Sequence, residues 1–203
     1  MIVIVEYQPR WPAEFENEHQ GHWKNQDWTI DFDGKAPDLW TSKSYKDFEL
    51  IADWRWSGPV FETEYPVILP NGDNKKDADG KPVMAKVKSA GDSGIYLRGS
   101  SKSQINIWCW PIGSGEVYGY RTDPKMPQDV KAGVTPKAVA DKPIGEWNRI
   151  HALMKGDRLT VDLNGVRVLD NAQLPGVSPE GPIALQNHGD PIQFANLYIK
   201  PLK

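Results

Sequence analysis

The stretch DRLTVDLNGVRVLDN (residues 157–171) predicts a β-hairpin. Leu159, Val161 and Leu163 alternate with polar residues, which is the pattern of a strand with one buried face. Asn164-Gly165 follows, and this pair supplies the positive backbone dihedrals of a tight two-residue turn. The chain is therefore expected to build its fold from antiparallel strands.

The same alternation continues in segments on both sides of this hairpin. WNRIHALMK (147–155) is expected to pair beside it, and PIALQNHGDPIQFANLYIK (182–200) is expected to give two closing strands. FELIADWRW (48–56) predicts a strand with one strongly apolar face. That face would carry Phe48, Leu50, Ala52, Trp54 and Trp56. No long segment has helical periodicity, so we predict an all-β fold with a two-sheet antiparallel jelly-roll sandwich.

Composition limits the remaining possibilities. The 203 residues suit a single sandwich domain over 1–203, in which 1–27 is an N-terminal extension packing on the sandwich. The 18 Gly, 17 Pro and nine Trp favour strands and turns over helices, with long loops at about 57–90 and 121–145. A net charge of −3 lacks the basic footprint of a nucleic-acid-binding protein.

Three further classes are disfavoured by simple counts. No apolar run reaches the roughly 18–20 residues that span a bilayer. MIVIVEYQPR (1–10) is too short and lacks the basic start of an intact signal peptide. The single Cys109 excludes an internal disulfide and a multi-cysteine zinc site, and its place on the apolar side of a predicted strand indicates a core residue.

The stretch GDSGIYLRGSSKSQINIWCW (91–110) predicts two strands with an unusual outer face. Tyr96 and Arg98 fall on one face of the first strand, opposite Ile95 and Leu97. The polar face of the second strand would carry Gln104, Asn106, Trp108 and Trp110. Indole faces stack on the C–H patches of sugars, while amides and a guanidinium bond their hydroxyls. We therefore predict a carbohydrate-binding groove, the alternative being a solvated face with some exposed aromatics.

A histidine and an aspartate lie close together in NHGD (187–190). If Ile183 and Leu185 face the core, Gln186 and His188 share the polar face. A histidine with an unperturbed pKa of about 6.5 suits a general base. The alternative is a structural histidine that closes a turn.

Two carboxylates could join this site. Glu116 lies in GSGEVYGYR with Tyr118 and Arg121, which are predicted substrate-binding residues. Asp53 points to the polar face of its strand, where it is equally well explained as an ion-pair partner of a neighbouring arginine. The Glu-x-Asp-x-x-Glu strand motif of sandwich-fold endoglucanases is absent, which argues against a retaining hydrolase with two carboxylates.

Four segments in order resemble one bacterial family, the 3-keto-disaccharide hydrolase domain family. They are DLWTSKSYKDFELIADWRW, DSGIYLRG, GEWNRIHALMKGDRLTVDLNGVRV and GPIALQNHGDPIQFANLYIKPL. The resemblance runs from about Trp28 to Leu202. That family is similar to concanavalin A-like lectins and glucanases, so the resemblance implies a concanavalin A-like jelly roll. It also implies a periplasmic or secreted protein that acts on a small-molecule carbohydrate.

The resemblance implies an enzyme that cleaves glycosides already oxidised to a ketone at C3, as a hydrolase or a lyase. The family motif positions are Arg98, His188 and Asp190, and Asp53 stands where the family commonly has Glu. We expect His188 to remove the proton at C2, with Asp190 or Glu116 orienting it, and Arg98 to stabilise the resulting enolate. A divalent metal ion held by His188 and carboxylates is an alternative stabiliser. The competing hypothesis is a non-catalytic carbohydrate-binding module.

Overall fold

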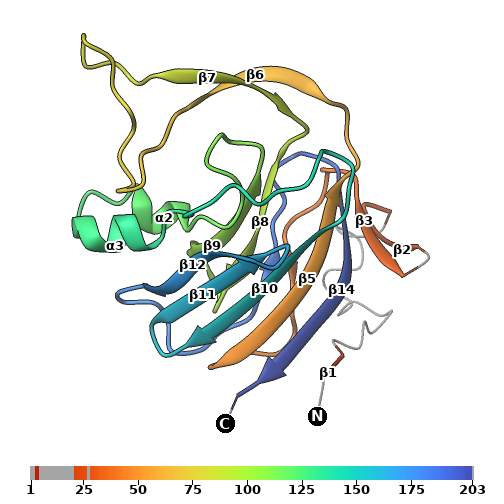
Figure 1. The fold of residues 1–203 in the computed structure, drawn as a ribbon. Helices are drawn as coiled ribbons and strands as arrows, with labels where there is room; N and C mark the ends of the chain where they lie inside the picture. The colour runs from red at the N-terminus through yellow and green to blue at the C-terminus, as the bar shows by residue number, and fades with distance from the viewer. Residues whose placement is uncertain (1–2, 5–20, 27, 203) are drawn as a thin grey trace.

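Two antiparallel sheets face each other across the core of the protein (Figure 1). The structure is a computed structural model, and it describes residues 3–4, 21–26 and 28–202. The predicted all-β jelly-roll sandwich is confirmed. The N-terminal extension expected over 1–27 lies largely outside the described residues, but Trp23–Gln26 within it forms a strand of the large sheet.

The large sheet has the strand order β12-β11-β10-β5-β14-β3-β2, and β1 pairs with β14. Its strands are β1 (Val3–Ile4), β2 (Trp23–Gln26), β3 (Thr29–Phe32), β5 (Phe48–Trp56), β10 (Asn148–Lys155), β11 (Arg158–Leu163), β12 (Val166–Gln173) and β14 (Ile192–Pro201). The small sheet has the order β4-β13-β8-β9, with β4 (Leu39–Trp40), β13 (Ala184–Leu185), β8 (Asp92–Leu97) and β9 (Ser100–Trp108).

The hairpin predicted from residues 157–171 is confirmed as β11 and β12. Leu159, Val161 and Leu163 are fully buried. Asn164 and Gly165 have φ values of 53° and 83°, as a turn of this type requires. The turn is also tied to the neighbouring strand, because the Arg149 N–H donates to Asn164 Oδ1 over 2.9 Å.

Strand β5 lies between β10 and β14 and carries the centre of the core. Every second side chain is buried, as the alternation predicts: Phe48, Leu50, Ala52, Trp54 and Trp56 are at most 4% exposed. Full burial of a large apolar side chain stabilises the fold by about 1.5–3 kcal/mol. This strand alone therefore accounts for a large part of the stability of the sandwich.

The small sheet is buried on both faces. Ile95 and Ile105 pack into the core, while Tyr96 and Gln104 on the opposite face are 7% and 8% exposed. The segment that follows β9 contains two short helices: α2 (Tyr118–Arg121) packs against β9, and α3 (Gln128–Gly133) packs against β12. A polar face buried in this way is not a simple solvated surface.

The segment 57–90, predicted as a long loop, contains a two-stranded hairpin of β6 (Phe61–Pro66) and β7 (Met84–Ser89), and residues 67–83 connect the two strands. The hairpin arches over one end of the sandwich in Figure 1. Its register places Glu62 opposite Lys88 and Glu64 opposite Lys86. Each pair of opposite charges contributes roughly 0.2–1 kcal/mol to strand pairing, which explains how so charged a segment forms strands. The second predicted loop, at 121–145, contains α3.

In the part of the chain that the structure describes, no helix has the length and apolar character needed to span a bilayer.

Candidate active site

Strand register brings most of the predicted binding residues onto one surface. Tyr96 lies opposite Gln104, and Asp92 lies opposite Trp108, so all four side chains share the face of the small sheet that turns away from the core. Asn106 lies between Gln104 and Trp108 on the same face. Gln186 follows the last residue of β13, and its backbone N–H donates to the Gly94 carbonyl of β8 over 2.9 Å. We call this surface the site face.

Amide groups form the middle of the site face. Gln104 Nε2 donates to Gln186 Oε1 over 2.5 Å and to the Ser93 carbonyl over 3.2 Å. Gly94 makes room for this side chain, because a Cβ there would lie only 2.1 Å from Gln104 Nε2. These amides are fixed in orientation, which suits hydrogen bonding to the hydroxyls of a sugar.

An aromatic pair forms one end of the site face. Burial raises the pKa of Tyr96 to about 12, so its phenol stays protonated. The Trp40 ring lies 5.7 Å from the Tyr96 ring and is 42% exposed. The sequence analysis missed Trp40, because β4 is too short to show alternation. An exposed indole beside buried amides is typical of a carbohydrate-binding surface.

Glu116 reaches the site face from a segment laid along the edge of β9. The Asn106 N–H donates to the Glu116 carbonyl over 2.9 Å, and the Gly115 N–H donates to the Asn106 carbonyl over 2.8 Å. Val117 enters the core, so the neighbouring Glu116 side chain turns the other way. The structure therefore brings this predicted residue together with the others.

The Glu116 carboxyl group is fully buried. Arg121 Nε donates to its Oε1, while its Oε2 finds no hydrogen-bond partner among the described residues. Burial raises the pKa of Glu116 to about 7; the Arg121 guanidinium opposes this rise and the nearby Asp92 adds to it. A buried carboxyl that titrates near neutral pH and has a free oxygen is suited to proton donation.

Asp92 completes a cluster with His188 and Asp190. The Asp92 backbone N–H donates to Asp190 Oδ2 over 2.9 Å. Burial raises the pKa of the Asp92 carboxyl to about 6, with His188 lowering it and Asp190 raising it further. His188 itself is exposed and therefore accessible to a ligand.

The sequence analysis missed Asp92, although a signal was present. The alternation that places Tyr96 on the polar face also places Asp92 there, four residues earlier. Gly91 is needed beside it, since its φ is 139° and a Cβ would lie 2.3 Å from the Asp190 Cβ. Only glycine lets Asp190 approach Asp92 in this way.

Four aromatic rings form the other end of the site face, and we call them the aromatic cluster: Tyr65, Trp108, Trp110 and Tyr118. Trp110 stacks on Trp108 with ring centroids 4.3 Å apart and on Tyr65 with centroids 5.0 Å apart. The Trp108 Nε1 donates to the Gly113 carbonyl over 2.6 Å. Trp108 and Trp110 cover part of each other's ring surface, which was predicted to contact sugars. Tyr118 is 43% exposed and is the accessible ring of the cluster.

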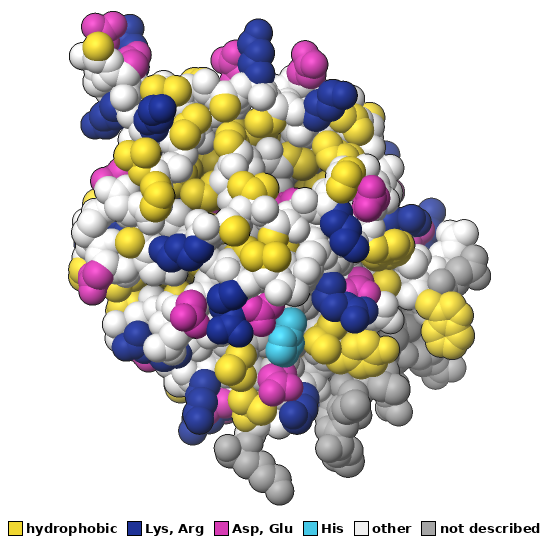
Figure 2. Space-filling view, in the orientation of Figure 1, with side chains coloured by type: hydrophobic (Ala, Val, Ile, Leu, Met, Phe, Trp, Pro, Cys, Tyr) yellow, Lys and Arg dark blue, Asp and Glu magenta, His cyan; other side chains and the backbone are white. Residues whose placement is uncertain are grey.

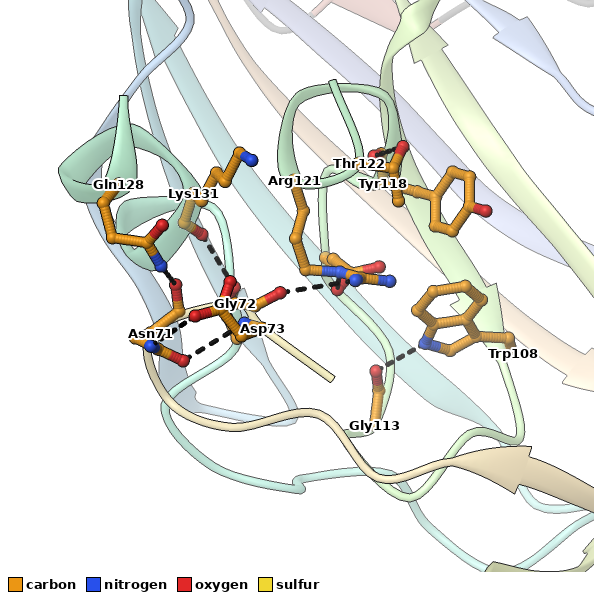
Figure 3. A network of polar contacts seen from close by, with 12 residues as sticks. Asn71, Gly72, Asp73, Trp108, Gly113, Tyr118, Arg121, Thr122, Gln128 and Lys131 are labelled. Atoms are coloured by element: carbon orange, nitrogen blue, oxygen red, sulfur yellow. Dashed lines mark hydrogen bonds and ion pairs between the residues drawn. The ribbon is translucent and has the colours of Figure 1, made fainter. Parts of the chain in front are cut away.

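Arg121 links this cluster to Glu116. Its guanidinium lies 5.3 Å from the centre of the Tyr118 ring and donates to the Gly72 carbonyl over 3.4 Å. Figure 3 shows the Arg121 side chain reaching from α2 toward Gly72, with Tyr118 and Trp108 on its other side. Arg121 is almost fully buried, so its position near Glu116 is well fixed.

Two predicted catalytic residues lie elsewhere, and the first is Arg98. The sequence analysis assumed that alternation continues through Arg98, but β8 ends at Leu97 and Arg98 has a φ of 52°. Its guanidinium bonds the carbonyls of Lys46, Gly156 and Ser178 at 2.7–3.0 Å and the Asp47 carboxylate at 3.1 Å. It lies at the opposite end of β8 from Asp92 and joins three loops.

The second is Asp53, which lies on the outer face of the large sheet. Arg149 donates to both of its carboxylate oxygens, over 2.6 and 2.7 Å, and Asn196 donates to one of them over 2.6 Å. This is the ion-pair interpretation that the sequence left open. The site face is on the other side of the sandwich, so Asp53 does not contribute to it.

The possible divalent metal ion stays a prediction. Among the described residues, no three His, Cys, Asp or Glu side chains are grouped closely enough to hold a metal ion.

The raised pKa of Glu116 makes the stability of the protein depend on pH. Between about pH 4.5 and pH 7 the native carboxyl keeps a proton that the unfolded chain has lost, so this group's contribution to stability falls as pH rises. We compare the change in the free energy of unfolding between pH 5 and pH 8 in the wild type and in Glu116→Gln. We expect this free energy to fall in the wild type by up to about 3 kcal/mol more than in the variant. Urea unfolding at both pH values measures this, and equal changes in the two proteins would contradict it.

Comparisons with known proteins bear on this site. A family model described as a 3-keto-alpha-glucoside-1,2-lyase-like domain matches residues 10–200. No curated protein matches the chain. Among solved structures, three proteins from Parabacteroides distasonis, each provisionally assigned as a glycosyl hydrolase, share the fold.

The first of these structures is 21% identical, with a TM-score of 0.60, over 89% of this chain and 74% of that one. The second is 19% identical, with a TM-score of 0.55, over 89% of this chain and 84% of that one. The third is also 19% identical, with a TM-score of 0.55, over 95% and 93% of the two chains.

Proposed function

Because this chain belongs to the 3-keto-alpha-glucoside-1,2-lyase-like domain family, we propose that it cleaves the glycosidic bond of sugars that carry a ketone at C3. The observation that best supports this is the buried Glu116 carboxyl, whose Oε2 has no partner among the described residues, together with Asp92 and His188. The family and the site face both indicate a carbohydrate-related function.

The chemistry of a 3-keto sugar needs few catalytic groups. The ketone acidifies the hydrogen at C2, so that a base can remove this proton and leave an enolate with its charge on the C3 oxygen. Collapse of the enolate expels the substituent at C1 and forms a C1–C2 double bond. Addition of water to that bond completes a net hydrolysis. The route requires one base and one group that stabilises the C3 oxygen, rather than two opposed carboxylates.

His188 is the proposed base. It is exposed and lies near the Asp92 carboxylate. Asp190 is held in place by the Asp92 N–H, and its role of orienting the histidine stays a prediction.

Glu116 is the proposed stabiliser of the C3 oxygen, in place of Arg98. With a pKa of about 7, a large share of Glu116 is protonated at neutral pH, and Oε2 can donate to a substrate once the residues that bury it move aside. Arg121 bonds the other carboxyl oxygen and so fixes the direction of that donation. Gln104, Gln186 and Asn106 would hold the sugar hydroxyls.

The test compares a 3-keto-disaccharide with its unoxidised parent. We expect cleavage of the keto sugar only, and slower turnover when C2 carries deuterium, because the C2–H bond breaks early in the route. Products are followed as reducing sugar and as unsaturated keto sugar, with and without a chelator to test the predicted metal. Equal cleavage of both disaccharides would contradict the proposal.

A non-catalytic carbohydrate-binding function is the second candidate, and the exposed Trp40 beside the ordered amides favours it. That function needs the aromatic and amide groups of the site face but no base. Saturable binding of a disaccharide without any turnover of its 3-keto form would support it over the enzyme.

A further inference from the structure

Asp38 is a half-buried carboxylate at the β4 edge of the site face. Leu39 packs against the core, so alternation turns Asp38 and Trp40 to the opposite side, where the Trp40 ring meets the Tyr96 ring. After burial, the charge of Asp38 is the next cause that raises the pKa of Tyr96, which places the two groups close together. Asp38 therefore belongs to the same surface as the predicted binding residues.

One oxygen of Asp38 holds the loop that carries His188. The Asn187 N–H donates to Asp38 Oδ1 over 2.7 Å. The Gly189 N–H in turn donates to Asn187 Oδ1, also over 2.7 Å. Asn187 and Gly189 flank His188, so these two hydrogen bonds set the place from which the imidazole leaves the backbone.

The segment that contains Asp38 touches this loop at a second point. Gly34 has a φ of 85°, and a Cβ there would lie 2.4 Å from the Gly189 carbonyl oxygen. Only glycine allows so close an approach in this backbone conformation. Residues 34–38 thus support the loop at both ends, and the bond from Asn187 to Asp38 is part of a packed contact.

The other oxygen of Asp38 is open to a ligand. Among the described residues Oδ2 has no hydrogen-bond partner, and it keeps contact with solvent, unlike Glu116 Oε2. A carboxylate oxygen only accepts hydrogen bonds, and the hydroxyls of a sugar can donate them. The neighbouring Trp40 is 42% exposed and offers an indole face to the C–H groups of the same sugar.

We propose that Asp38 connects substrate binding with the position of the base. Its Oδ2 accepts a hydrogen bond from a hydroxyl of the bound sugar, while its Oδ1 holds the loop of His188. The inference rests on the proposed function, because it takes the site face as the sugar site and His188 as the base. Asp38 affects the base only through Asn187, so it is a binding and positioning residue and transfers no proton itself.

Two substitutions separate the roles of the two oxygens. Asp38→Asn keeps an oxygen for the Asn187 N–H but puts a donor in place of Oδ2, whereas Asp38→Ala removes both acceptors. Asp162→Asn is the matched control, since Asp162 pairs with Arg167 on the outer face of the large sheet, where Figure 2 shows acidic and basic side chains interspersed. The probe is methyl α-D-glucoside, which carries no ketone and is not a substrate of the proposed reaction.

We expect the wild type and Asp162→Asn to bind this glucoside with equal affinity in calorimetry, and Asp38→Asn to bind it at least tenfold more weakly. Hydrogen exchange of the Asn187 amide and the imidazole NMR signals of His188 should be unchanged in Asp38→Asn. In Asp38→Ala the amide should exchange at least tenfold faster and the imidazole signals should shift. With a 3-keto-glucoside, Asp38→Ala should lower kcat at least tenfold further than Asp38→Asn does.

Wild-type affinity in Asp38→Asn, or no saturable binding by the wild type, would overturn the proposal, as would unchanged exchange and imidazole signals in Asp38→Ala. If Asp38→Ala fails to fold, as judged by circular dichroism, Asp38→Leu takes its place, because leucine fills a similar volume without an acceptor. A wild type that binds the glucoside but never cleaves a 3-keto-glucoside would defeat the proposed reaction, while the binding and exchange measurements would still decide the role of Asp38.

Discussion

Replacing Glu116 by glutamine is expected to lower kcat/KM for a 3-keto-glucoside by roughly 100- to 10,000-fold, the usual contribution of a positioned acid. Glutamine keeps an oxygen for the Arg121 Nε, but its amide is a far weaker acid than the carboxyl that it replaces. The loss should appear mainly in kcat, because the hydrogen bond to the C3 oxygen strengthens only as charge develops there.

The pH profile gives a second, independent readout of this substitution. If Glu116 must be protonated, wild-type kcat/KM falls as pH rises through about 7, the value to which burial raises its pKa. Glu116→Gln should lose this alkaline limb. Glu49→Gln is the matched control, since Glu49 is a half-exposed residue on β5 that pairs with Lys200. Near wild-type turnover by Glu116→Gln would remove Glu116 from the mechanism.

Replacing Arg98 by alanine is expected to destabilise the protein by about 3–5 kcal/mol, because breaking a buried ion pair also leaves its partners without donors. The Arg98 side chain is 1% exposed, and its removal would strand the carbonyls of Lys46, Gly156 and Ser178 and the Asp47 carboxylate. For a chain of this length, the change corresponds to a fall in Tm of roughly 10 °C.

Thermal unfolding and activity measured on the same samples separate a structural role from a catalytic one. Arg98→Ala should keep near wild-type turnover per folded molecule at low temperature, despite its lower Tm. Arg167→Ala, which removes an exposed arginine that pairs with Asp162, should change stability by no more than about 0.5 kcal/mol. An Arg98→Ala protein with wild-type Tm and no turnover would restore the role that the sequence analysis gave it.

Much of the fold follows directly from alternation along the sequence. Strand β5 and the turn at Asn164-Gly165 are predictable because burial and local turn geometry act over a few neighbouring residues. The same rule places Gln104, Asn106 and Trp108 on one face of β9. It fails at Arg98, because β8 ends one residue earlier and the turn through Arg98 and Gly99 directs the arginine side chain away from the site face.

The remaining errors come from contacts between distant segments. The hairpin of β6 and β7 depends on pairing Glu62 with Lys88 across 25 residues of polar sequence, which resembles a loop when read locally. Asp92 is different: its place on the site face was available from the alternation, and its significance depended on Asp190, which lies 98 residues away.

The proposed acid is carried by a segment attached to the margin of β9 through two backbone hydrogen bonds, and not by a strand within the sheet. A margin of this kind accepts replacement segments of different length, since no interior strand has to move. Residues 110–135 also contribute Val117, Tyr120, Val130 and Val134 to the core, so a replacement segment has to keep apolar side chains at these four positions. A graft between relatives that keeps them should leave the Tm of the host scaffold unchanged.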